Sequence, residues 1–281
     1  MSSLPTSSLD PARKGRVKVM GILNVTPDSF SDGGLYLSEQ EINNRIKEMI
    51  STGADIIDVG GESTRPFAES VSLDEELQRI IPAIKIIRLI NDSIPISIDT
   101  TKAEVARQAI KAGATIVNDI SALRFDPAMV EVVRENKVPV IIMHMQGTPG
   151  DMQNSPTYDD VIMDIKSFLT ERISWAITQG ISPSKIIIDP GLGFGKTVAH
   201  NLSILKNLPK LQKLGYPVII GHSRKSFISK IIAPKGDEDR DTATAAISAL
   251  CAAQNVSILR VHDVKKTVQA VRLAEAIQNA P

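Results

Sequence analysis

The sequence IIIDPGLGFGKT, residues 186–197, runs from a short apolar segment into one carboxylate and then into a glycine-rich turn. Its first three residues are isoleucines without polar alternation, which is typical of a strand buried on both faces in a parallel sheet covered by helices. Asp189 therefore lies where the buried strand ends. We interpret the turn after Asp189 as a sharp turn over which the backbone can approach another group closely.

Two phosphate-binding patterns are excluded in this turn by their spacing. A Walker loop ending at Gly195 needs a glycine five residues earlier, and Pro190 stands there. A dinucleotide fingerprint that begins with Gly191 and Gly193 needs a third glycine, and Lys196 stands there. The turn therefore predicts close backbone approach without specifying a nucleotide.

The plan of strand, polar loop and helix recurs along the whole chain. Strands are expected at residues 17–24, 55–59, 95–98, 115–117, 138–143, 186–189, 217–220 and 257–261. Helices are expected after capping boxes at Ser38 and Ser72, over residues 102–113 and 158–179, in the segments that reach Gln254, and over residues 264–277 after the cap Asp263. Pro82 is expected to kink the second helix or to mark its start.

Alternating strands and helices predict a parallel sheet, and eight such units in about 260 residues match a (β/α)₈ TIM barrel. An open doubly wound sheet is the alternative, but it would collect its polar residues near one switch point. In this sequence polar residues follow every strand. We therefore predict one barrel domain over residues 17–281, preceded by a flexible arm at residues 1–16.

The composition narrows the class of partner. The chain has 281 residues, of which 42% are hydrophobic and 23% charged, as in a soluble globular protein. Its 32 Lys and Arg balance its 32 Asp and Glu, so no basic field favours nucleic acid or an anionic membrane, and a small-molecule substrate is expected. The lone Cys251 and the lack of a secretory or membrane-spanning segment predict a cytoplasmic protein.

In a barrel the carboxyl ends of all strands face one mouth, so polar residues far apart in sequence are expected to meet there. They are Asn24, Asp99, Asn118, Asp189, Lys225, Arg260 and His262. Arg260 and His262 are two residues apart and should share one side of a strand, which suggests an anion site. The alternative is that both are tied to neighbouring helix ends.

The strand-end carboxylates need hydrogen-bond donors, because an unpaired buried carboxylate is costly. Asp99 and Asp189 could bond to loop amides or to a ligand that offers N–H groups. Lys225 could form a Schiff base or donate hydrogen bonds, and its chemistry alone does not decide. The four histidines lack zinc-site spacing, whereas an oxygen ligand such as Asn24 suits Mg²⁺ shared with a polyphosphate.

Eight motifs follow one another in a fixed order over nearly the whole chain. They are residues 20–34 (MGILNVTPDSFSDGG), 58–66 (DVGGESTRP), 97–102 (SIDTTK), 118–119 (ND), 143–147 (MHMQG), 189–195 (DPGLGFG), 221–226 (GHSRKS) and 260–263 (RVHD). Each motif alone is weak, but together and in this order they resemble the dihydropteroate synthase family. Only the segment before Val17 lies outside the resemblance.

The resemblance implies a transferase of folate biosynthesis. Such an enzyme joins p-aminobenzoate to 6-hydroxymethyl-7,8-dihydropterin pyrophosphate, releasing pyrophosphate and 7,8-dihydropteroate. It also implies that sulfonamides, which mimic p-aminobenzoate, compete at the site, and that the chain pairs through its later helices as a homodimer.

The resemblance further assigns residues to each part of the substrates. The pterin would be bound by Asp99, Asn118, Ile120, Met143, Asp189, Phe194 and Lys225. The pyrophosphate would be held by Asn24, Thr64, Arg260 and His262, with the cofactor Mg²⁺ on Asn24. The p-aminobenzoate would contact Phe30, Thr64, Arg65, Pro66, Lys225 and Ser226. The residues expected to carry the chemistry are Asn24, Asp99, Lys225, Arg260 and His262.

Two other functions remain open at this point. One is a pterin-binding barrel that transfers a methyl group from methyltetrahydrofolate to a corrinoid protein. The other is a non-catalytic pterin-binding paralogue, which we expect to lack a pyrophosphate ligand. The loop TPDSFSDGG and the pair Arg260 and His262 favour the synthase.

Overall fold

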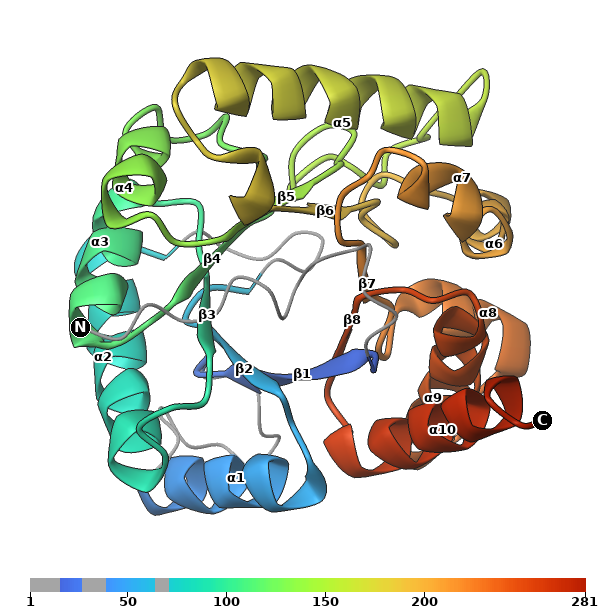
Figure 1. The fold of residues 1–281 in the computed structure, drawn as a ribbon, viewed down its shortest axis with the longest axis horizontal. Helices are drawn as coiled ribbons and strands as arrows, with labels where there is room; N and C mark the ends of the chain where they lie inside the picture. The colour runs from blue at the N-terminus through green and yellow to red at the C-terminus, as the bar shows by residue number, and fades with distance from the viewer. Residues whose placement is uncertain (1–15, 27–38, 64–70) are drawn as a thin grey trace.

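The computed structural model describes residues 16–26, 39–63 and 71–281 of the chain. Eight strands enclose its centre and helices surround them (Figure 1). The strands are β1 (Lys18–Asn24), β2 (Ile56–Gly60), β3 (Ile96–Asp99), β4 (Ile116–Asp119), β5 (Val140–Met143), β6 (Ile186–Asp189), β7 (Ile219–Gly221) and β8 (Ile258–Val261). All eight strands predicted from the sequence are present, each displaced at its ends by no more than two residues.

The helices alternate with the strands, as the pattern predicted. They are α1 (Glu39–Thr52), α2 (Leu73–Ile90), α3 (Ala103–Ala112), α4 (Met129–Asn136), α5 (Val161–Thr178), α6 (Val198–Lys206), α7 (Leu208–Gln212), α8 (Ser226–Ile232), α9 (Asp237–Ala253) and α10 (Val264–Gln278). None of these helices combines the length and the apolar composition that crossing a bilayer requires.

The sheet curls into a nearly closed barrel. All neighbouring strands pair in parallel, in the order β6-β5-β4-β3-β2-β1-β8-β7. A parallel bridge between Ile188 and Val218 links the two ends of this order. The TIM barrel is therefore confirmed, and the open doubly wound sheet is excluded.

Two apolar cores hold the barrel together. The larger one lies between strands and helices and includes Leu259 and Val261 of β8, which face outward. The smaller one fills the barrel interior with one layer of side chains: Met20, Ile56, Ile116, Ile141, Ile187, Ile219 and Ile258. Because side chains alternate along a strand, the residues two positions further on also point inward.

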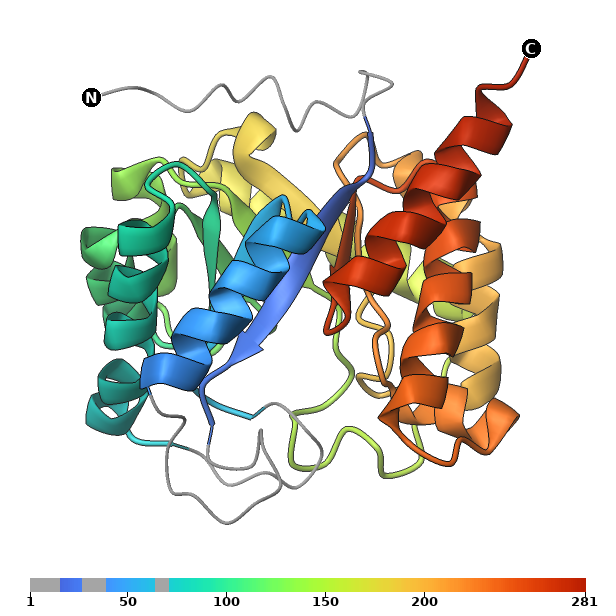
Figure 2. The same cartoon turned by 90° about the horizontal axis from the view of Figure 1, so that it is seen from below.

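The interior changes from apolar to polar over those two positions. The inward residues after the apolar layer include Asp58, Asn118, Asp189 and Arg260, at the carboxyl ends of their strands. Figure 2 shows β1 descending between α1 and α10, with its carboxyl end at the lower face and the carboxyl terminus of the chain above. The apolar layer is therefore the floor of a polar site at one mouth of the barrel.

Local signals set most of the helix boundaries. Ser72 caps α2 by accepting a hydrogen bond from the Glu75 amide, and Asp263 caps α10 through the Lys266 amide. The helix α2 begins well before Pro82 and continues beyond it, so the expectation that Pro82 marks the helix start was wrong. The expected capping box at Ser38 lies outside the described residues.

Candidate active site

Arg260 of β8 joins two carboxylates across the barrel interior. Its Nε donates to Asp58 Oδ2 at 2.6 Å, and its Nη2 donates to Asp99 Oδ2 at 2.6 Å. The three side chains come from β8, β2 and β3, whose carboxyl ends meet at the mouth. The guanidinium provides two directed donors with a permanent charge, so one side chain satisfies both acids.

Asp58 was not assigned a role from the sequence, yet it is fully buried. Its other oxygen, Oδ1, lies 3.5 Å from Asn118 Nδ2 at the end of β4. The signal was present in the strand IIDVG, because a carboxylate between buried apolar residues requires a partner. Sequence alone could not say that this partner is Arg260, which lies 202 positions away.

Burial and ion pairing oppose each other at this cluster. Desolvation raises the pKa of Asp99 above its ordinary value, while the guanidinium of Arg260 lowers it. The neighbouring Asp58 and Glu76 raise the pKa of Asp99 further. Burial acts to lower the pKa of Arg260, but Asp58 and Asp99 together raise it above its ordinary value, so its positive charge is permanent.

Asp189 ends β6 in the same layer. Its Oδ1 accepts a hydrogen bond of 2.7 Å from the Gly191 amide, as the interpretation of a loop-bonded carboxylate predicted. Burial raises the pKa of Asp189 to about 6, against the lowering effect of that amide and of Lys225 and Lys196. The second oxygen accepts no hydrogen bond from the described residues, which leaves it able to receive donors from a ligand.

Gly191 makes this turn possible. Its backbone has φ +68°, and a Cβ placed there would lie 2.0 Å from the carbonyl oxygen of His144. Any side chain would therefore push the loop after β6 away from the end of β5. The predicted close backbone approach is confirmed, although the neighbour is another loop of the chain.

Lys225 lies over the apolar part of the site. Its Nζ is 4.1 Å from the centre of the Phe194 ring, and its stem packs against Gly193. Burial and the positive charge of Arg260 lower the pKa of Lys225 to about 8, while Asp189 and Asp99 act in the opposite direction. The apolar surface itself consists of Ile120, Met143, Met145, Met152 and Phe194.

The spacing of the glycines argued against a phosphate-binding loop at Lys196. In the structure this lysine is buried and forms hydrogen bonds between two loops. Its buried Nζ lies 3.0 Å from His144 Nδ1 and 2.9 Å from the Phe194 carbonyl oxygen. It therefore ties the loop after β6, which carries Phe194, to the loop after β5. Burial lowers the pKa of Lys196 to about 7 and that of His144 to about 2, so the histidine remains neutral.

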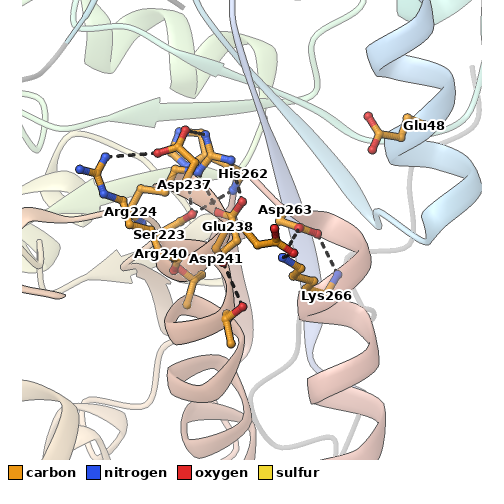
Figure 3. A network of polar contacts seen from close by, with 12 residues as sticks. Glu48, Ser223, Arg224, Asp237, Glu238, Arg240, Asp241, His262, Asp263 and Lys266 are labelled. Carbon is orange, nitrogen blue, oxygen red and sulfur yellow. Dashed lines mark hydrogen bonds and ion pairs between the residues drawn. The ribbon is translucent and has the colours of Figure 1, made fainter. Parts of the chain in front are cut away.

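The loop after β7 is anchored to α9 by a fork of ion pairs (Figure 3). Arg224 Nε and Nη2 bond to the two oxygens of Asp241 at 2.8 and 2.7 Å, and Nη1 lies 2.9 Å from Asp237 Oδ2. Arg224 has φ 57°, a left-handed conformation that surrounding contacts must hold in place. The neighbouring Ser223 bonds to His262, just beyond β8.

Asn24 ends β1 beside Gly60. A Cβ placed on Gly60 would lie 3.6 Å from Asn24 Oδ1 and 3.9 Å from Asp99 Oδ2, so the two oxygens flank this glycine. Among the described residues no group of three His, Cys, Asp or Glu side chains could hold a metal ion alone. An amide oxygen next to a carboxylate fits Mg²⁺ that is shared with a phosphate, since Mg²⁺ often binds through one or two protein oxygens.

A cavity of about 350 Å³ opens beside Asp99. It is lined by Glu62, Ser63, Asp99, Thr100, Thr101, Lys102, Ile120, Phe125, Pro149 and Gly150. Lys102 forms its polar edge, with Nζ 2.5 Å from Glu62 and 2.6 Å from the buried Glu76. The cavity thus extends the site from Asp99 and Ile120 toward the loops after β2 and β5.

The structure brings together most of the residues predicted for the site. Ten of them lie at the mouth of the barrel: Asn24, Asp99, Asn118, Ile120, Met143, Asp189, Phe194, Lys225, Arg260 and His262. Ser226 begins α8 and is exposed. Phe30, Thr64, Arg65 and Pro66 lie outside the described residues, so their assignment stays a prediction.

Comparison with known proteins identifies relatives of the whole barrel. Residues 20–262 match the family model described as "Pterin binding enzyme". A dihydropteroate synthase of Synechocystis sp. is 48% identical over 262 residues, covering 93% of this chain and 90% of the relative.

Two solved structures have the same fold. A Yersinia pestis dihydropteroate synthase in a sulfonamide drug complex superposes with a TM-score of 0.90 at 40% identity, covering 99% of this chain and 98% of that one. A Xanthomonas albilineans dihydropteroate synthase in complex with 7,8-dihydropteroate gives a TM-score of 0.86 at 40% identity, covering 97% and 99%.

Replacing Arg260 by Met should destabilise the fold strongly. The change leaves Asp58 and Asp99 buried without their cation, and breaking such a buried pair costs about 3–5 kcal/mol. Urea unfolding measures this loss. Arg107→Met is the matched control, because Arg107 pairs with Glu104 at the surface and should contribute less than about 1 kcal/mol. Equal unfolding free energies for the two variants would contradict the proposed importance of the cluster.

Proposed function

The chain belongs to the pterin binding enzyme family and is a transferase of the dihydropteroate synthase type, and we propose that it joins 6-hydroxymethyl-7,8-dihydropterin pyrophosphate to p-aminobenzoate. The observation that carries this proposal is the Asp189 carboxylate beside the apolar surface of Met143 and Phe194. A flat ring with N–H groups along one edge needs such a combination. The relatives over nearly the whole chain favour the synthase over methyl transfer or a non-catalytic paralogue.

The pterin ring lies against Phe194 and Met143, with its amino and N3 edge donating to Asp189. Two parallel donors match the two oxygens of one carboxylate. Asn118 bonds a remaining ring nitrogen, and Lys225 donates to the carbonyl side of the ring. Rings that lack these groups are rejected, because the buried polar side chains would be left unpaired.

The pyrophosphate of the substrate binds toward Asn24, Arg260 and His262. Arg260 already forms ion pairs with Asp58 and Asp99, so its charge is largely compensated before the substrate arrives. This arrangement supports a metal requirement, because the leaving group needs further positive charge. Asn24 would hold Mg²⁺ at this position, and the ion would supply positive charge against the negative charge that develops on pyrophosphate.

The bond between the pterin methylene and the pyrophosphate oxygen breaks before the new C–N bond is complete. Positive charge then develops on the methylene, and the electron-rich pterin together with Asp99 stabilises it. The amine of p-aminobenzoate attacks this carbon and loses a proton afterwards. An aromatic amine is neutral at pH 7, so no side chain is needed as a base to activate it.

Purified protein should incorporate labelled p-aminobenzoate into dihydropteroate when it is given the pterin pyrophosphate and Mg²⁺. Removal of Mg²⁺, or Asn24→Ala, should lower kcat/KM at least about tenfold, the minimum expected for disturbing a metal site. Asn44→Ala on the exposed face of α1 is the control. Metal-independent product would overturn the role of Mg²⁺ alone. Pterin binding without any product would leave methyl transfer or a non-catalytic role.

Binding of 6-hydroxymethyl-7,8-dihydropterin should weaken as the pH falls below about 6, the pKa of Asp189. Because this pKa is raised above the ordinary value of 3.8, the folded protein protonates Asp189 before an exposed aspartate would be protonated. The acid form accepts one pterin donor fewer, so Kd should rise by up to about tenfold for each further pH unit. Calorimetry between about pH 5 and about pH 8 tests this relation.

The matched variant for this measurement is Asp189→Asn. It should bind the pterin weakly at every pH, without the dependence that Asp189 gives to the parent protein. A parent protein whose Kd stays constant across the range would show that the Asp189 carboxylate is not the pterin acceptor.

The same function is proposed to reside in a homodimer that pairs through α6, α8 and α9. These helices surround an apolar groove of about 550 Å³. Large apolar side chains at its edge are exposed: Leu202 by 45%, Ile231 by 54%, Ile232 by 43% and Leu250 by 65%. A contiguous apolar face of this kind marks an interaction surface, and a second copy can cover it around a two-fold axis.

Leu250→Glu should convert the dimer into a monomer, because it places a charge within the apolar face. Light scattering after size-exclusion chromatography gives the mass directly. Leu89→Glu is the control, since Leu89 on α2 is 87% exposed and lies away from the groove. A monomeric parent protein, or a dimer that survives Leu250→Glu, would contradict the proposed interface.

A further inference from the structure

Ser223 has no role in the assignments above, yet its hydroxyl makes two contacts with one residue of the site. The side chain is buried, in the loop between β7 and α8. Its Oγ accepts a hydrogen bond of 3.1 Å from the backbone N–H of His262. The same Oγ lies 2.9 Å from Nδ1 of the His262 ring.

These two contacts leave the hydroxyl proton of Ser223 free for the ring of His262. A backbone N–H can only donate, so Oγ acts as the acceptor toward it and keeps its own proton. At 2.9 Å, Nδ1 of His262 is within reach of that proton. When the hydroxyl donates to Nδ1, Nδ1 carries a lone pair.

The ring of His262 is neutral and therefore carries a single proton on one of its two nitrogens. Burial lowers the pKa of His262 to about 3, and the cations Arg224, Arg260, Lys225 and Arg45 lower it in the same direction. With the lone pair on Nδ1, the proton of a neutral imidazole is on Nε2. No hydrogen bond to Nε2 is recorded from the described residues, and the His262 residue is partly exposed.

We propose that Ser223 is a positioning residue that holds His262 in the Nε2–H tautomer, so that this N–H is a donor to the departing pyrophosphate. Phosphate oxygens only accept hydrogen bonds, so the opposite tautomer would present a lone pair to an anion. The role of the anion rests on the proposed function. The tautomer itself rests only on the contacts of Ser223.

The two chain neighbours of Ser223, His222 and Arg224, are both anchored to α9. Arg224 is fixed by its two bonds to Asp241, and His222 is buried with Nε2 3.0 Å from the Thr244 carbonyl oxygen and 2.9 Å from Ser248 Oγ. Asp241, Thr244 and Ser248 all lie on α9. Figure 3 shows Ser223 and His262 beside the ion pairs of Arg224 with Asp237 and Asp241. The hydroxyl is therefore held in place before any substrate binds.

Nitrogen-15 NMR of histidine-labelled protein tests the tautomer without substrate. The signal of His262, assigned by its loss in His262→Gln, should show a protonated Nε2 and an unprotonated Nδ1. A proton on Nδ1 in the folded parent protein would overturn the proposal. Because no reaction is involved, this result is independent of whether the chain makes dihydropteroate.

The matched variants Ser223→Ala and Ser184→Ala test the consequence for anion binding. Ser184 is exposed and precedes β6, at the end of the strands opposite to the mouth. With Mg²⁺ and inorganic pyrophosphate as the probe, Ser223→Ala should weaken binding about tenfold and Ser184→Ala should leave it unchanged. Binding of 6-hydroxymethyl-7,8-dihydropterin, which has no phosphate, should be unchanged in Ser223→Ala.

The two sets of results separate the possible failures. Equal pyrophosphate affinity in the parent and Ser223→Ala, with the parent making dihydropteroate, would overturn the role of Ser223 and leave the proposed function. A confirmed Nε2–H tautomer and weakened pyrophosphate binding in a protein that makes no dihydropteroate would overturn the function and leave the anion site. Loss of pterin binding and pyrophosphate binding together would indicate general damage to the mouth and would contradict a specific role for Ser223.

Discussion

The pairing of Arg260 with Asp58 and Asp99 is the interaction on which the rest of the site depends. Two carboxylates inside a barrel would repel each other and would each be costly to desolvate. One guanidinium satisfies both, with distances of 2.6 Å to each acid. The apolar layer beneath them closes the barrel interior, so these charges face one opening only. Burial imposes a desolvation cost on these charges. It also strengthens their electrostatic interaction with a ligand, because little water screens them.

The apolar floor and the polar layer arise from one feature of strand geometry. Inward positions recur every second residue, so Ile187 and Asp189 of β6 face the same interior, as do Ile258 and Arg260 of β8. On each of these strands, the first inward side chain is apolar and packs in the floor of the barrel. The inward side chain two positions later is polar and faces the site. Each strand contributes its polar group at nearly the same height, which is why residues far apart in sequence form one site.

This regularity explains which parts could be predicted from the sequence. The strands, the barrel and the position of Asp189 follow from local patterns. The carboxylate at the end of an apolar run marks, in the sequence itself, where the buried strand ends. The helices α4, α6 and α7 were not predicted, because their eight, nine and five residues are too short to show a clear apolar periodicity. The partners of Asp58, Lys196 and Ser223 were also beyond the sequence, because each depends on how separate loops or strands meet. A buried charge or hydroxyl indicates that a partner exists, but only the folded barrel identifies it.

The loop after β7 links the two ends of the proposed substrate. Ser223 faces His262, the proposed contact of the departing pyrophosphate, and Lys225 faces Phe194 and Asp189, the proposed contacts of the pterin. Arg224 stands between them and bonds away from the site to α9. In the proposed reaction, one anchored segment of three residues therefore sets the separation between ring recognition and leaving-group recognition, with the bond to be broken between these two points. Catalysis gains from such fixed spacing, because groups that are already in place need no reorganisation as charge develops.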